Sequence, residues 1–103
     1  MKPKTGAKLI AEERRRQIDD VGYGLSHDDG HDQHELALAA ARYALPSHFD
    51  QMVIWDVELG ERIWPWSPDD FKPDQSRVRN LVKAGALIAA EIDRIQRIEA
   101  KAR

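Results

Sequence analysis

The densest group of side chains that could carry chemistry lies in the segment SHDDGHDQHE, residues 26–35. Histidines and carboxylates supply the nitrogen and oxygen ligands that Zn, Mn or Fe ions bind. A metal site here would use His27, Asp28, His31 and Glu35. The alternative is a helix-capping loop, because carboxylates are stabilised at the positive N-terminus of a helix. No HExxH motif is present, so we favour capping over a metal, and recognition of a ligand without metal stays open.

Polar side chains interrupt the apolar face of the first predicted helix, residues 5–20. Glu13, Arg14 and Gln17 fall on that face. One interpretation is that Arg14 extends its charged end to solvent. The other is a polar network or a ligand contact in a cleft, because polar groups on a packing face need partners.

In the second interpretation, Arg14 and Gln17 face the loop that carries His27, Asp28 and Asp29, with a tryptophan of the WPW segment nearby. Arginine forms bidentate bonds with carboxylates and phosphates. Arg14 is therefore expected to hold Asp28 when the site is empty and a phosphate when a ligand is bound.

An aromatic and basic stretch precedes the last helix. Trp64, Trp66, Phe71 and Lys72 could stack a base and hold a phosphate, although tryptophans of a small protein also serve as core. Lys83 lies off the packing stripe of the last helix. It could contact a ligand, or it could be an ordinary surface lysine. The complete predicted ligand site is Arg14, Gln17, Tyr23, His27, Asp28, Asp29, Trp64, Trp66, Lys72 and Lys83.

The sequence predicts a mainly α fold that would position these residues. It is a single three-helix domain, residues 1–103, with a short β-hairpin between helices 2 and 3. Periodicity and turn residues predict helices over residues 5–20, 33–45 and 75–103, with the hairpin in QMVIWDVELGERIWPW. Thr5 and Asp32 are the expected N-caps. The second helix is apolar nearly all round, which predicts a central, buried helix. The packing stripe of the third helix is predicted to be Val78, Leu81, Gly85, Ile88, Ile92 and Ile95.

Composition narrows the function classes. The net charge of −2 argues against nucleic acid held by bulk electrostatics. Without cysteine there are no disulfides or thiolate metal sites, and no apolar run is long enough for a signal peptide or a membrane span. We therefore expect a cytoplasmic protein. A thin core and an apolar second helix predict a homo-oligomer.

Three sequence blocks resemble a family of small phage and prophage proteins. They are AEERRRQIDDVGY with HDDGHDQHELALAAARYA, then WPWSPDDFKP, then RNLVKAGALIAAEIDRI. The first block of that family reads ER-x-RQ, a glycine and an aromatic, HDD-x-H and a glutamate. The matching residues here are Glu13, Arg14, Arg16, Gln17, Gly22, Tyr23, His27, Asp28, Asp29, His31 and Glu35.

The chain departs from that pattern at Tyr23 and Phe71, where tryptophan is commoner, and at Arg79-Asn80, where the family has paired arginines. The resemblance implies a phage accessory role without a known activity. The glycine-aromatic turn, the Pro-Trp segment and VRNLVKAGALI are also similar to the ryanodine-receptor-type repeat domain, a helical module that can bind nucleotides.

Three functions follow as hypotheses. The leading one is a non-enzymatic module, without a cofactor, that binds a small anionic ligand such as a nucleotide or nucleotide-derived signal in phage–host conflict. The alternative is a metal-dependent nucleotide hydrolase built on His27, Asp28, Asp29, His31 and Glu35. The third is a protein–protein adaptor.

Overall fold

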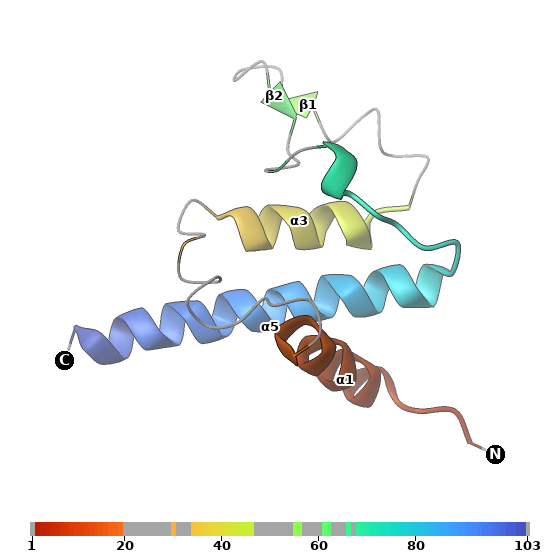
Figure 1. Cartoon of the computed structure of the whole chain (residues 1–103), viewed down its shortest axis with the longest axis horizontal. Helices are drawn as coiled ribbons and strands as arrows, with labels where there is room; N and C mark the ends of the chain where they lie inside the picture. Colours follow the sequence, from red (N-terminus) through yellow and green to blue (C-terminus); the bar gives the residue numbers. More distant parts are fainter. Residues whose placement is uncertain are drawn as a thin grey trace.

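The computed structural model shows a mainly helical protein in which two shorter helices pack on one long helix. The helices of the described part are α1 (Gly6–Asp19), α3 (Glu35–Ala44) and α5 (Arg77–Lys101). In Figure 1, α3 runs along one side of α5 and α1 crosses it on another. The structure describes residues 2–19, 30, 34–46, 55–56, 61–62, 66 and 68–102.

Local signals set the helix ends close to where the sequence predicts them. The Thr5 hydroxyl accepts the Lys8 N–H at 3.2 Å, and the Ser76 hydroxyl accepts the Arg79 N–H at 3.2 Å. At the end of α3, Leu45 is extended (ψ 139°), as expected of a residue before proline. The expected Asp32 cap is wrong, because α3 begins at Glu35 and His34 occupies the cap position with φ 67°.

The core lies between α3 and α5 and is built from small side chains. Its buried members are Leu36, Ala39, Ala40, Ala84, Leu87 and Ala90. Alanines leave little side-chain volume between the two helices, so their backbones can lie close together. Trp66 and Phe71 are partly buried against this cluster, which agrees with a core role for both rings.

Two predictions about the core are wrong. The central helix is α5, which contacts both α1 and α3, whereas the outer side of α3 is exposed at Ala37 and Ala41. The predicted stripe of α5 does not line the core: Val78, Leu81, Ile88, Ile92 and Ile95 are 41–60% exposed. The alanine-rich side of α5 is buried instead.

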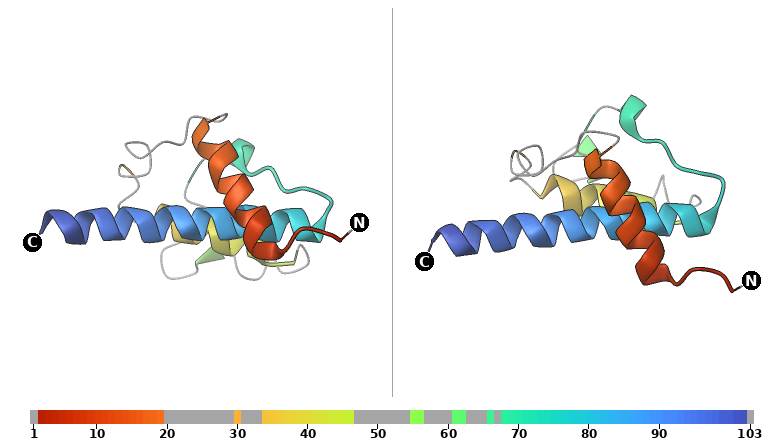
Figure 2. Two further views of the ribbon diagram at one scale, coloured as in Figure 1. Left: turned by 90° about the horizontal axis from the view of Figure 1, so that it is seen from below. Right: turned by 60° about the horizontal axis from the view of Figure 1, so that its bottom comes forward.

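Close packing of α1 on α5 depends on Gly85. A Cβ atom at this position would lie 2.5 Å from Cδ1 and 2.7 Å from Cγ1 of Ile10. Figure 2 shows α1 crossing α5 obliquely. Glycine therefore makes room for the Ile10 side chain at the helix crossing.

The rest of the described chain is short. Strands β1 (Trp55–Asp56) and β2 (Glu61–Arg62) pair antiparallel, and the 3-10 turn η2 spans Pro68–Asp70. Two residues per strand do not establish the predicted hairpin, whose other residues lie outside the described ones. In the described residues, no helix combines the length and the hydrophobicity needed to cross a bilayer.

Candidate functional site

The structure places a buried carboxylate, Glu13, at the contact between α1 and α5. Its side chain is 1% exposed. Nε and Nη2 of Arg16 donate hydrogen bonds to Oε1 and Oε2, both at 2.8 Å, and Nε2 of Gln17 donates to Oε2 at 3.1 Å. Arg79 of α5 pairs with Oε1 from across the interface. A carboxylate this deeply buried is tolerated because guanidinium groups neutralise it.

The partners of Glu13 keep it ionised. Burial by itself raises the pKa of a carboxyl group. The hydrogen bond from Arg16 and the positive charges of Arg79 and Arg16 outweigh burial, so the pKa of Glu13 lies below its ordinary value of 4.5. Glu13 is therefore a structural anion, and its charge ties α1 to α5.

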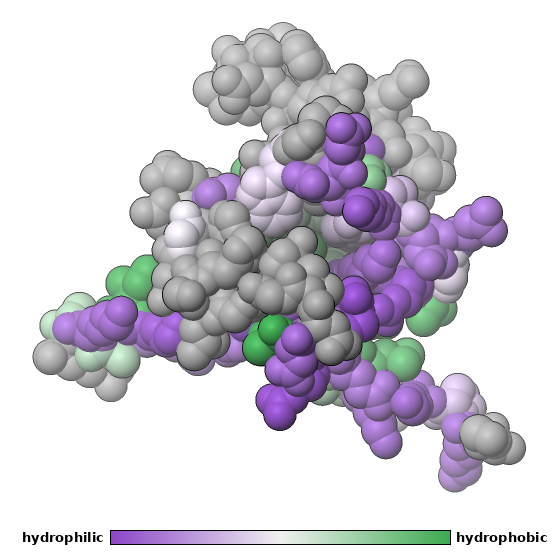
Figure 3. All heavy atoms as spheres, in the orientation of Figure 1, coloured by the Kyte–Doolittle hydropathy of each residue, from purple (hydrophilic) through white to green (hydrophobic). Residues whose placement is uncertain are grey.

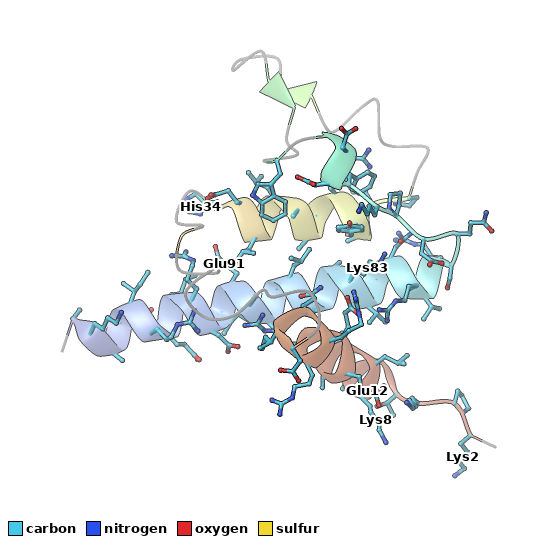
Figure 4. The ribbon with its side chains drawn as sticks, viewed as in Figure 1. Lys2, Lys8, Glu12, His34, Lys83 and Glu91 are labelled. Atoms are coloured by element: carbon cyan, nitrogen blue, oxygen red, sulfur yellow. The ribbon has the colours of Figure 1, made fainter. Side chains whose placement is uncertain are left out.

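Two further ion pairs involve buried arginines of α1 and α5. Nη2 of Arg14 lies 3.8 Å from Oδ2 of Asp93 on α5, and the Arg14 side chain is only 10% exposed. Nε of Arg94 donates to Oε1 of Glu91 at 2.6 Å, and both of these residues are buried. The interpretation that Arg14 extends to solvent is wrong, because its side chain is buried. By contrast, Lys8 and Glu12 point away from α5 (Figure 4).

Half of the predicted ligand site cannot be placed. Tyr23, His27, Asp28, Asp29 and Trp64 lie outside the described residues, so the contact between Arg14 and Asp28 stays a prediction. The same holds for the metal hypothesis at His27, Asp28, His31 and Glu35, because only Glu35, at the start of α3, is described. Among the described residues, no three histidine or acidic side chains gather as a metal site would require.

A hollow of about 440 Å³ lies where the C-terminus of α3 meets the N-terminus of α5. Two cations and two aromatic rings dominate it. The Arg42 guanidinium lies 4.0 Å from the centre of the Phe71 ring, and that ring lies 5.0 Å from the ring of Tyr43. Arg77 donates a hydrogen bond to the carbonyl of Ala44, the last residue of α3. The lining residues are Arg42, Tyr43, Leu45, Pro46, Phe71, Pro73, Asp74, Gln75, Arg77 and Asn80.

Two of the predicted site residues, Lys72 and Lys83, lie beside this hollow. Nζ of Lys83 donates to the carbonyl of Lys72 at 2.9 Å and sits 5.7 Å from the centre of the Tyr43 ring. The Lys72 N–H donates to the Tyr43 hydroxyl at 3.1 Å. Arg14 and Gln17 contact Asp93 and Glu13 instead. The predicted residues therefore form two groups with different partners.

Among the described lining residues, Asp74 supplies the carboxylate, and it is engaged in the turn that leads into α5. Oδ1 of Asp74 accepts the Ser76 N–H at 2.8 Å, while the Asp74 backbone exchanges hydrogen bonds of 2.6 and 2.9 Å with the Asn80 side chain. Asn80 thereby braces the turn that leads into α5. With Asp74 held in this turn, Arg42, Arg77 and the helix N-terminus give the hollow a positive character that suits an anion.

Sequence reasoning missed the central residues of this hollow, which are Arg42, Tyr43, Arg77 and Asn80. A signal was present: Arg42 comes just before the Pro46 stop, and Arg77 just after the start of the last helix. Basic residues at the facing ends of two helices, with Phe71 between them in sequence, form a pattern that could have been singled out.

Comparison of the chain with protein-family models, curated proteins and solved structures returned no match.

Proposed function

We propose that this protein binds a small anionic ligand without catalysis, and that the hollow between α3 and α5 is the binding site. The observation that carries the proposal is that Arg42 and Arg77 line one hollow together with the Phe71 and Tyr43 rings. Guanidinium groups recognise phosphate through two parallel hydrogen bonds, and aromatic rings stack on planar bases. A nucleotide presents both features, which makes it the ligand class that best fits this lining.

The volume of the hollow supports a ligand of this size. At about 440 Å³ it falls within the range of small-molecule sites, roughly 300–1,000 Å³. Lys72 and Lys83 beside it add positive charge without filling it. The buried layer around Glu13 is a weaker candidate, because its guanidinium groups already neutralise the protein's own carboxylates.

The test is a thermal-shift titration with ADP and with inorganic pyrophosphate, using adenosine as the uncharged control. Ligand at about 100 times its Kd should add about 2.7 kcal/mol of stability, an upward shift of roughly 10 °C or more for a domain of this size. Arg42→Gln and Arg77→Gln should abolish the shift. Arg15→Gln is the matched control, because Arg15 pairs with Asp19 on the exposed side of α1.

The shift caused by ligand is the quantity to compare, because Arg42→Gln also removes the contact with the Phe71 ring and lowers the starting stability. No stabilisation by either phosphate compound, or equal shifts in Arg42→Gln and Arg15→Gln, refutes the proposal. Divalent-dependent release of phosphate from ADP would favour the hydrolase hypothesis instead.

We further propose that the chain forms a homo-oligomer. Large apolar side chains remain exposed on α5, and an oligomer would remove them from water.

A further inference from the structure

The longest exposed apolar surface of the described chain runs along one side of α5. Val78, Leu81, Ile88, Ile92 and Ile95 are each 41–60% exposed. At 3.6 residues per turn they lie within about 100° of one another around the helix axis. The side that faces α3 is a different one, and α1 borders this face at Gly85, against which Ile10 packs. Figure 3 shows hydrophobic side chains reaching the surface near the C-terminal end of α5.

The spacing of this face is that of a helix-pairing seam. Val78, Leu81, Gly85, Ile88, Ile92 and Ile95 follow one another at intervals of 3, 4, 3, 4 and 3 residues. This repeat keeps one stripe of a helix against a partner helix over its whole length. The partner must therefore be a helix of comparable length, about 30 Å, with a matching apolar stripe. In the described chain, α1 and α3 are much shorter than α5.

We infer that the partner is α5 of a second copy, packed antiparallel about a two-fold axis at Ile88. Four exposed apolar residues form pairs about Ile88, because Leu81 and Ile95 each lie seven positions from it and Val78 and Ile98 each lie ten. In the antiparallel arrangement, Leu81 of one copy packs against Ile95 of the other, and Ile88 packs against itself. This inference deepens the homo-oligomer proposed above by giving its surface.

Charge favours the antiparallel direction over the parallel one. Arg77 and Glu99 lie eleven positions before and after Ile88. An antiparallel pair places Glu99 of one copy beside Arg77 and the positive helix N-terminus of the other. A parallel pair would place Arg77 against Arg77 and Glu99 against Glu99, which is repulsive.

The exposed area is sufficient for a dimer. About half of each large side chain is exposed, which gives an apolar patch on the order of 500 Å², at the upper end of what monomers show. Two such patches would bury roughly 1,000 Å², the lower limit for a specific interface. We therefore expect a reversible dimer whose population depends on protein concentration.

The chain has no cysteine, so single-cysteine variants report the geometry without background. Under mild oxidation, Ile88→Cys should cross-link to itself, and a mixture of Leu81→Cys with Ile95→Cys should give the mixed dimer. Leu81→Cys alone should cross-link poorly, because its partner in the other copy is Ile95. Ala37→Cys, on the exposed side of α3, is the control and should stay monomeric.

Light scattering of the unmodified chain provides the second measurement. We expect twice the chain mass of 11.8 kDa at micromolar concentration, and the single mass for Ile88→Asp with unchanged helical circular dichroism. Ile88→Asp should still give the ADP shift, so failure of the dimer and failure of the ligand site are distinguishable. A monomeric unmodified chain, a dimer that survives Ile88→Asp, or self-cross-linking of Leu81→Cys at the rate of Ile88→Cys overturns the inference.

Discussion

Replacing Glu13 with glutamine tests whether its buried charge holds α1 on α5. The carboxylate accepts hydrogen bonds from Arg16, Gln17 and Arg79 while its side chain is 1% exposed. Glutamine keeps the shape, but it removes the negative charge and turns an amide NH₂ toward guanidinium donors. The variant therefore leaves Arg16 and Arg79 without their counter-charge.

The magnitude follows from how far these arginines are buried. Removing one partner of a buried ion pair costs about 3–5 kcal/mol. Here the Arg16 and Arg79 side chains are 44% and 35% exposed, so both recover part of their hydration when the carboxylate is lost. We therefore expect Glu13→Gln to lower the free energy of unfolding by about 2–3 kcal/mol, which lowers Tm by roughly 10–20 °C.

Glu12→Gln on the same helix is the matched control. Glu12 pairs with Lys4 at 3.0 Å, but the two side chains are 45% and 53% exposed. Exposed pairs of this kind contribute about 0–1 kcal/mol. Urea unfolding followed by circular dichroism, at one protein concentration and pH 7, measures both variants. A Glu13→Gln loss no larger than that of Glu12→Gln refutes the structural role of the buried charge.

The effect of Glu13 should depend on pH with a defined sign. The pKa of Glu13 is lower in the folded chain than its ordinary value of 4.5. The stabilisation is therefore fully present above pH 4.5 and is lost as the pH falls through the folded pKa. The stability difference between the unmodified chain and Glu13→Gln should shrink below pH 4.5. A difference that is constant from pH 7 to acid would show that the charge is not its source.

Two further substitutions test the packing and the capping of α5. Gly85→Ala should destabilise the fold by about 1 kcal/mol, because overpacking against Ile10 outweighs the better helix propensity of alanine. In an Ile10→Ala background the same change should become stabilising, and an unchanged sign would exclude the proposed clash. Asn80→Ala should cost about 1–2 kcal/mol, since both hydrogen bonds to the Asp74 backbone are lost. Thermal unfolding checks it, and a loss below a few tenths of a kcal/mol would contradict the bracing role.

Part of the candidate site could be foreseen from the sequence. Arg14 and Gln17 stood out because they interrupt an apolar face, and both are buried in the polar layer between α1 and α5. Lys72 was singled out from an aromatic and basic stretch and Lys83 because it lies off the packing stripe of the last helix, and the two lie together beside the hollow. Arg42 and Arg77 were not predicted, because in the sequence each is an ordinary charged residue of a helix. Only the fold brings the end of α3 and the start of α5 together.

The sequence by itself determined the helices, because the signals that start and stop them act over a few residues. Thr5 and Ser76 bond to N–H groups three positions away, and Pro46 keeps Leu45 extended. These interactions are local and do not depend on how the helices later pack. The predicted helix bounds therefore agree with the structure to within about two residues.

Tertiary structure alone decided which side of α5 is buried. Hydrophobicity favoured the isoleucine side of α5 as the core, yet α3 and α1 pack on the side that carries Ala86 and Ala90. Alanines bring the helix backbones close together, an advantage that appears only when the neighbouring helix is in place. The burial of Glu13 likewise depends on Arg79, which lies 66 residues away in the sequence. A charged side chain can be buried only where an opposite charge pairs with it. For Glu13 and Arg79 this pairing exists only in the folded chain.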